Sequence, residues 1–124
     1  MACFILIADD NPIVRHALRT CLERTSGWVI CGEAADGIEA IEKARQLRPD
    51  LIILDLSMPG LNGLEAARSL KLETPSTPLL MFTSFKNPTL EREAVAAGCV
   101  ALFAKSEMDL LFSAIRQLMT QDKD

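Results

Sequence analysis

The sequence predicts an α/β fold: a single doubly wound domain in which a five-stranded parallel sheet carries helices on both faces. Two observations lead to this prediction. Short apolar runs alternate five times with segments of helical periodicity, and strict alternation of strands and helices favours a parallel sheet covered by helices. No linker, repeat or low-complexity segment interrupts the alternation along the 124 residues, a length suited to one domain.

The strands are expected where apolar runs of strand length lie between turn signals. Phe4–Ala8 is apolar throughout, as in a strand buried on both faces. The other four expected strands are Trp28–Cys31, Leu51–Leu54, Leu79–Phe82 and Val100–Ala104.

The helices are expected from their start and stop signals. Asn11 and Pro12 read as the N-cap and first residue of the first helix, and Asp36 as the cap of the second, which Pro49 stops. The third follows Gly63, and the fourth runs from Pro88 to a closing Gly98. The residues expected to face inward, by helical spacing, are Val14, Ala17, Leu18, Cys21; Ile38, Ile41, Ala44; Leu64, Ala67, Leu70; and Met108, Leu111, Phe112, Ile115, Leu118, Met119.

Composition excludes several classes of function. The 13 basic and 17 acidic residues give a formal net charge of −4. There is no basic run, which argues against direct binding of nucleic acid or an anionic membrane. The apolar stretch Cys3–Ala8 is too short for a membrane span or a signal peptide, so a cytoplasmic location is the default expectation.

The cysteines and the histidine give no sign of a metal site. Cys3, Cys21, Cys31 and Cys99 form no CxxC pair, and we expect them to be free thiols that pack as small apolar residues. The single histidine, His16, is expected at the surface.

Polar residues stand where four of the five strands end. Asp9 and Asp10 follow the first strand, Asp55 the third, Thr83 and Ser84 the fourth, and Lys105 the fifth. Each has an ordinary structural role available to it: an aspartate can cap a helix, and a lysine can be solvated. In a doubly wound sheet, however, these positions share the edge where ligands bind. Their convergence therefore indicates a site.

The residue types at this edge suit phosphoryl chemistry. Acidic oxygens are the ligands that Mg²⁺ prefers. A carboxylate beside such a metal can attack phosphorus to form an aspartyl phosphate. A hydroxyl and an ammonium can hold the oxygens of the transferred group.

The chain resembles a receiver domain of the response-regulator family of two-component signalling, from Ile5 to about Leu118. The resemblance rests on "ADDNPIVR", "LIILDLSMPGLNG", "MFTS" and "AAGCVALFAK". It implies a flavodoxin-like (βα)5 fold with strand order 2-1-3-4-5. It also implies that residues 1–124 form the receiver domain, with no output domain in this chain.

The resemblance also implies residue roles. Asp55 would accept a phosphoryl group from a sensor histidine kinase or a phosphotransfer protein. Mg²⁺, or Mn²⁺, would be held by Asp10, Asp55 and the backbone carbonyl of Ser57, with Asp9 acting through water. Thr83 and Lys105 would contact the phosphoryl oxygens. The chain would not be an enzyme, since its only chemistry would be Mg²⁺-dependent self-phosphorylation at Asp55 and autodephosphorylation.

The family's output comes from the face formed by the fourth helix, fifth strand and fifth helix, which changes shape on phosphorylation. A homodimer through this face is one expected consequence, and control of transcription by a NarL/LuxR-type regulator is another. Two switch residues are implied. Thr83 would move toward the phosphoryl group, and Leu102 stands at the position where the family usually has an aromatic residue. Phe103, next to it, is expected to point to the other face. Ser106 replaces a frequent proline after the lysine, and Ser57 occupies a position that tunes phosphoryl lifetime.

Three alternative functions make different demands on the sequence. An aspartyl-phosphate phosphatase would need a second carboxylate two residues after the nucleophile, where this chain has Ser57. A flavin-binding flavodoxin would need aromatic rings and a hydroxyl-rich phosphate loop, whereas the chain has no tyrosine and one tryptophan. A degenerate receiver that only mediates protein contacts is the third alternative, with Leu102 in its favour.

Overall fold

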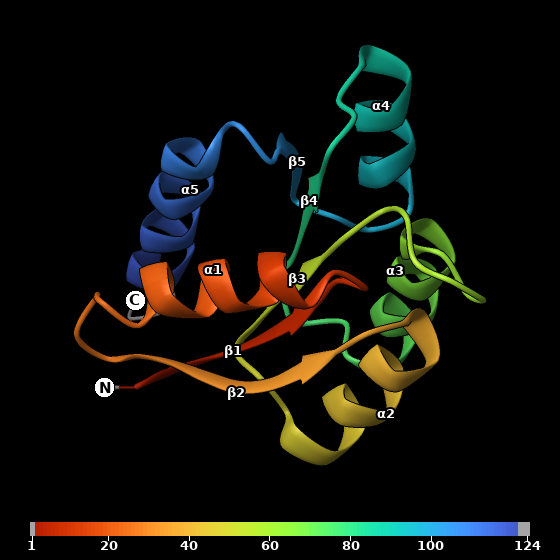
Figure 1. Ribbon diagram of the computed structural model, residues 1–124. Helices are drawn as coiled ribbons and strands as arrows, with labels where there is room; N and C mark the ends of the chain where they lie inside the picture. The colour runs from red at the N-terminus through yellow and green to blue at the C-terminus, as the bar shows by residue number, and fades with distance from the viewer. Residues whose placement is uncertain (1, 122–124) are drawn as a thin grey trace.

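A five-stranded parallel sheet in the order β2-β1-β3-β4-β5 forms the centre of the computed structural model, which describes residues 2–121. The strands are β1 (Cys3–Ala8), β2 (Trp28–Ala34), β3 (Leu51–Leu54), β4 (Leu79–Thr83) and β5 (Ala101–Ala104). The helices are α1 (Pro12–Leu22), α2 (Gly37–Leu47), α3 (Gly63–Glu73), α4 (Pro88–Ala96) and α5 (Met108–Gln121). The predicted fold and strand order are confirmed (Figure 1).

Asparagine or aspartate caps the first four helices. The side chains of Asn11, Asp36, Asn62 and Asn87 each accept a hydrogen bond from a backbone N–H in the first turn of α1, α2, α3 and α4 respectively. Such caps satisfy backbone donors that have no partner within the helix. The predicted caps Asn11 and Asp36 are therefore confirmed.

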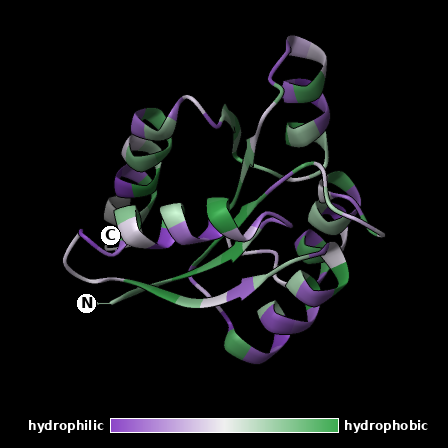
Figure 2. Ribbon diagram, viewed as in Figure 1, coloured by the Kyte–Doolittle hydropathy of each residue, from purple (hydrophilic) through white to green (hydrophobic). Residues whose placement is uncertain are grey.

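Two apolar clusters lie on opposite faces of the sheet. One packs beneath α1 and α5 and includes Ile5, Leu18 and Phe82. The other packs beneath α2, α3 and α4 and includes Leu6, Leu70 and Leu102. Figure 2 shows mainly apolar strands between helices of mixed hydropathy. Burial on both faces explains why the central strands read as continuous apolar runs.

Leu102 and Phe103 lie on opposite faces of β5, as predicted. Leu102 belongs to the cluster beneath α2, α3 and α4, whereas Phe103 packs against the cluster beneath α1 and α5. Alternate residues of a strand point to opposite faces. No ring therefore stands at the expected switch position.

Four strands differ from their predicted bounds. β1 begins one residue earlier, at Cys3, and β4 continues one residue further, to Thr83. β2 continues to Ala34 because Gly32, Glu33 and Ala34 pair with β1 after a register shift between Ile5 and Leu6. β5 begins at Ala101, and Val100 before it is exposed. Phe4 is 43% exposed, so the amino end of β1 is not buried on both faces.

Two helix positions predicted to face inward are wrong. Ala17 is exposed, because the buried stripe of α1 follows an i, i+4, i+8 spacing through Val14, Leu18 and Leu22. Ile38 is 58% exposed at the first turn of α2, whereas Ala40, which was not predicted to face inward, is buried together with the predicted Ala44.

No disulfide joins the four cysteines, all of which lie in the described residues, and only Cys3 and Cys99 are buried. Cys21 and Cys31 are partly exposed, which corrects the expectation that all four pack inside. Burial raises the pKa of the Cys99 thiol to about 11, so it carries little thiolate at neutral pH. His16 is exposed, as predicted.

Candidate functional site

Three aspartates meet at the carboxyl edge of the sheet. Asp9 and Asp10 follow β1, and Asp55 follows β3, the strand beside it. One carboxylate oxygen from each lies within 4.8 Å of the other two. Asp9 and Asp55 are buried, whereas Asp10 is exposed, so the cluster opens to solvent on one side.

The sheet itself fixes the backbone of the two buried aspartates. The Asp9 N–H donates to the carbonyl of Ala34 at 2.9 Å, and the Asp55 N–H donates to the carbonyl of Ala8 at 2.8 Å. The Asp9 side chain also accepts from the Asn11 N–H at 2.9 Å. Hydrogen bonding of the sheet therefore continues past the strand ends and holds the carboxylates in place.

Lys105 supplies the positive charge of the site. Its Nζ lies 3.0 Å from Asp9 Oδ2 and 3.6 Å from Asp55 Oδ2. The Lys105 N–H donates to the carbonyl of Thr83, which anchors the start of the β5–α5 loop on β4. A buried carboxylate is costly unless it is paired, and one ammonium pairs with two of them here.

The surroundings of Asp55 raise the pKa of its carboxyl group. Burial, and then the charge of Asp9, raise the pKa of Asp55 from its ordinary value to about 6. Lys105 and a backbone hydrogen bond from Ser57 oppose this rise, and Asp10 adds to it. Excess negative charge thus remains at the site after Lys105 has been counted. The donors are all oxygens, and this set fits a hard divalent cation such as Mg²⁺.

The loop after Asp55 depends on glycine. The Gly63 N–H donates to the carbonyl of Leu56 at 2.9 Å. A Cβ at Gly63 would lie 2.3 Å from the carbonyl oxygen of Asp55, closer than any real contact. Gly60, with φ of +71°, adopts a backbone conformation that side chains disfavour. The turn after β3 thus closes tightly behind Asp55.

The hydroxyl residues lie beside the acidic cluster on the next strand. Thr83 ends β4 and is buried, whereas Ser84 is exposed. Within residues 2–121, neither hydroxyl is hydrogen-bonded to Asp9, Asp10 or Asp55. Ser57 is exposed in the loop two residues after Asp55.

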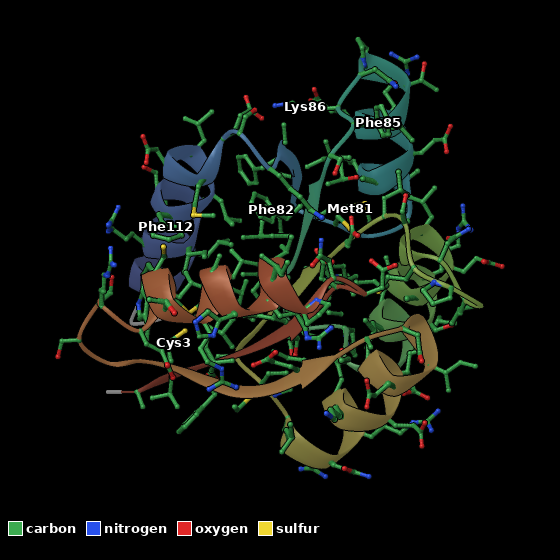
Figure 3. The ribbon with its side chains drawn as sticks, in the orientation of Figure 1. Cys3, Met81, Phe82, Phe85, Lys86 and Phe112 are labelled. Atoms are coloured by element: carbon green, nitrogen blue, oxygen red, sulfur yellow. The ribbon has the colours of Figure 1, made fainter. Side chains whose placement is uncertain are left out.

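Two cationic residues that follow strands at the carboxyl edge of the sheet were not predicted to have a role. Arg15 donates from Nη1 to the backbone carbonyl of Asp9 at 2.7 Å. Lys86, in the β4–α4 loop (Figure 3), lies 2.9 Å from Glu107 Oε1 and 5.9 Å from the centroid of the Phe103 ring. Contacts between loops leave no periodic signal in a sequence. The only hint was the i, i+4 pair of arginines, Arg15 and Arg19, in α1.

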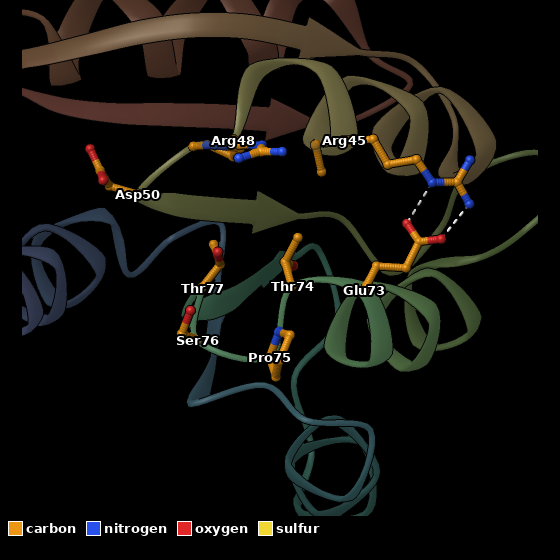
Figure 4. Close-up of a pocket in the computed structure, with 10 residues that line it drawn as sticks. Arg45, Arg48, Asp50, Glu73, Thr74, Pro75, Ser76 and Thr77 are labelled. Atoms are coloured by element: carbon orange, nitrogen blue, oxygen red, sulfur yellow. Dashed lines mark hydrogen bonds and ion pairs between the residues drawn. The ribbon is translucent and has the colours of Figure 1, made fainter.

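A separate hollow of about 850 Å³ lies at the opposite edge of the sheet, between the ends of α2 and α3. Arg45 and Glu73 pair across it, with Arg45 Nε 2.7 Å from Glu73 Oε2 (Figure 4). Its lining includes none of the strand-end residues predicted for the site.

None of the helices in the described part of the chain is both long and apolar enough to span a membrane.

Comparison with known families gives a match over nearly the whole chain. The model of the response regulator receiver domain matches residues 5–116. Among curated proteins, the transcriptional regulatory protein YxjL of Bacillus subtilis is 34% identical, over 90% of this chain and 52% of its own length. The response regulator protein VraR of Staphylococcus aureus is 37% identical, over 86% of this chain and 51% of its own length. The chain thus spans about half the length of these relatives.

Solved structures show the same fold. A two-component response regulator of the LuxR family, from an Aurantimonas species, superposes with a TM-score of 0.92 at 32% identity, covering 98% of this chain and 87% of that one. The response regulator domain of CheB from Thermotoga maritima superposes with a TM-score of 0.90 at 29% identity, covering 97% of this chain and 98% of that one.

Proposed function

Because this chain belongs to the response regulator receiver domain family, we propose that it is a phosphorylation-dependent switch whose phosphoacceptor is Asp55. The observation that carries the proposal is the placement of Asp55 at the end of β3, buried and within reach of two further carboxylates and an ammonium. A carboxylate with a purely structural role would be more stable without two further carboxylates beside it.

In the proposed step, a carboxylate oxygen of Asp55 attacks phosphorus in a phosphohistidine of a sensor kinase or phosphotransfer protein. The new bond is Asp55 Oδ–P. The P–N bond breaks, and its electron pair leaves with the imidazole nitrogen. Asp55 must be ionised to attack, and the elevated pKa of about 6 leaves it mainly ionised at neutral pH.

Asp10, Asp55 and the backbone carbonyl of Ser57 would hold Mg²⁺ or Mn²⁺, with Asp9 acting through water. When bound, the cation neutralises charge on the transferred group. Asp10 suits this role because it is exposed, and its carboxylate makes no ion pair with another described residue. Asp9, by contrast, already accepts from Lys105 and from the Asn11 N–H.

Lys105 and Thr83 would contact the oxygens of the phosphoryl group on Asp55. Lys105 already lies 3.6 Å from Asp55, and Thr83 shares a backbone hydrogen bond with Lys105. A phosphoryl group would bind both Lys105 and Thr83. These new contacts would favour one of two arrangements of the face formed by α4, β5 and α5 and so shift the equilibrium between them. Leu102 is buried in the core beside this face, so we propose that switching proceeds without an inward-swinging ring.

The output is proposed to be control of transcription, since relatives of about twice this length are transcriptional regulatory proteins. In this proposal residues 1–124 act as the receiver domain, in the cytoplasm, and form a homodimer on phosphorylation. The domain turns over no other substrate, because Ser57 stands where a phosphatase of this chemistry needs a second carboxylate. Direct nucleic-acid binding by this domain is not part of the proposal.

Intact-mass analysis after incubation with acetyl phosphate, with and without Mg²⁺, tests the proposal. Wild type should gain one phosphoryl group only when Mg²⁺ is present. Asp55→Asn should gain none. Asp109→Asn, which changes an exposed aspartate at the start of α5, should behave as wild type. Absence of any addition to wild type would favour the contact-only receiver instead.

A further inference from the structure

Within residues 2–121, Arg15 makes the only side-chain hydrogen bond to the peptide that joins Asp9 to Asp10. Its Nη1 donates to the carbonyl of Asp9 at 2.7 Å. Its Nε donates to Glu33 Oε1 at 2.9 Å, so one guanidinium bridges the β1–α1 loop and β2. The Arg15 side chain is 19% exposed, which limits its freedom to move.

This contact bears on Asp10 more than on Asp9. The Asp9 carboxylate is held directly, by Lys105 and by the Asn11 N–H. The Asp10 carboxylate makes no hydrogen bond or ion pair to any other described side chain, so its direction follows from the backbone that carries it. That backbone is the peptide whose oxygen Arg15 holds.

Arg15 also contributes charge without occupying a metal ligand. Its guanidinium contacts a backbone oxygen and Glu33, and none of the three carboxylates of the cluster. Lys105 differs in this respect, because it pairs directly with Asp9 and Asp55. Arg15 therefore places a cation near the cluster while the oxygens of Asp10 remain available.

Glu33 in turn fixes Arg15. Its second oxygen accepts from Arg19 Nε at 2.7 Å, and Lys43 donates to its backbone carbonyl. Partial burial alone would raise the pKa of Glu33, but the hydrogen bonds and charges of Arg19 and Arg15 outweigh this effect and lower the pKa overall. The Glu33 carboxylate therefore stays ionised at neutral pH. Two arginines thus share one carboxylate, but only Arg15 reaches the loop of the acidic cluster.

We propose that Arg15 is a positioning residue for the divalent cation: by holding the Asp9 carbonyl, it aims the Asp10 carboxylate into the cluster. This inference rests on the function proposed above. Groups that orient a metal's ligands, without touching the metal, commonly change its affinity by about 10- to 100-fold. Arg19 serves as a matched control because it shares Glu33 with Arg15 and makes no contact with Asp9.

The test is titration of the whole chain with Mn²⁺, with free Mn²⁺ followed by electron paramagnetic resonance. No phosphodonor is present, so the readout is metal binding itself. Arg15→Ala should weaken Mn²⁺ binding about tenfold or more, and Arg19→Ala should stay within about twofold of wild type. Arg15→Lys keeps the charge and most of the stem but cannot form both bonds with one compact ammonium, so it should fall between Arg15→Ala and wild type. Thermal melts in EDTA establish whether each variant is folded. If Arg15→Ala does not fold, the comparison is made with Arg15→Lys.

The outcomes separate the two proposals. If wild type binds Mn²⁺ and both Arg15 variants bind it equally well, the positioning role is wrong and the proposed function stands. Equal losses in Arg15→Ala and Arg19→Ala would also overturn the role, because they would point to general loosening around Glu33. If wild type itself binds no Mn²⁺, the metal-dependent function and the role of Arg15 fail together.

Discussion

The Lys105 ammonium lies 3.0 Å from a carboxylate oxygen of Asp9, nearer than the 3.6 Å that separates it from Asp55. The lysine therefore pairs first with the neighbour of the proposed nucleophile. Lys105 neutralises Asp55 only in part, and the pKa of Asp55 stays elevated because of burial and the charge of Asp9. This asymmetry leaves the proposed acceptor both ionised and incompletely compensated.

Removing Lys105 should destabilise the domain. In Lys105→Met, Asp9 and Asp55 would be buried without a counter-charge, and we expect a loss of about 1–3 kcal/mol in the free energy of unfolding at neutral pH. Urea unfolding in EDTA measures it. A double-mutant cycle with Asp9→Asn should show that the two changes are not additive. Simple additivity would mean that the 3.0 Å pair contributes nothing.

Asp55→Asn should stabilise the metal-free domain at neutral pH but not in acid. The folded-state pKa of Asp55 is raised to about 6, so the protonated form is the one favoured by folding. The associated stability is fully present below pH ~4 and is lost as the pH rises through about 6. Above that pH the ionised carboxylate costs about 2–3 kcal/mol, which the amide removes.

Chemical denaturation in EDTA at acidic and at neutral pH measures this difference. Added Mg²⁺ should narrow the gap at neutral pH, because a cation that binds only the folded state raises its stability. A gap of the same size at both pH values would contradict the electrostatic origin of the effect.

Gly63→Ala should disturb the loop behind Asp55. The new Cβ would meet the Asp55 carbonyl at 2.3 Å and the Leu56 Cα at 2.8 Å, both of them backbone atoms. We expect a loss of about 2 kcal/mol or more and slower labelling by acetyl phosphate. Gly60→Ala is the matched control, because a Cβ there has nothing within 4 Å and only the positive φ is strained. Its cost should be about 1 kcal/mol, with labelling little changed.

Lys86 should hold the β4–α4 loop against the β5–α5 loop. Lys86→Met removes the 2.9 Å pair with Glu107 and the contact with the Phe103 ring. We expect faster amide exchange in both loops, with a change in global stability of no more than about 1 kcal/mol. Glu91→Gln removes only the 3.9 Å pair and should leave exchange near that of wild type. Unchanged exchange in Lys86→Met would show that the loops are held by other contacts.

The sequence allowed the sheet to be predicted because its central strands are buried on both faces and read as plain apolar runs. The site was predictable for the related reason that each polar strand end, such as Asp55 after Leu51–Leu54, breaks such a run. The end of β2 was not predictable in this way. Glu33 looks like a loop residue in the sequence, but it lies in an edge strand where two arginines neutralise it.

Side-chain contacts across the fold could not be predicted from the sequence, for a different reason. Arg15 and Asp9 are near in sequence, but their bond depends on the angle at which α1 leaves β1 and on Glu33, which lies on another strand. Ile38 showed the converse limit: its helical spacing was compatible with burial, yet its place in the first turn of α2 leaves it exposed. Periodicity gives the face of a helix, and packing decides how far along that face the core extends.

The most direct test of the central claim is to locate the phosphoryl group. After treatment with acetyl phosphate and Mg²⁺, borohydride reduction converts an aspartyl phosphate to homoserine, and peptide mass mapping finds the altered residue. We expect homoserine at position 55 alone, and none when Mg²⁺ is replaced by EDTA. Reduction at Asp9 or Asp10 with an intact Asp55, or no altered residue at all, would contradict it.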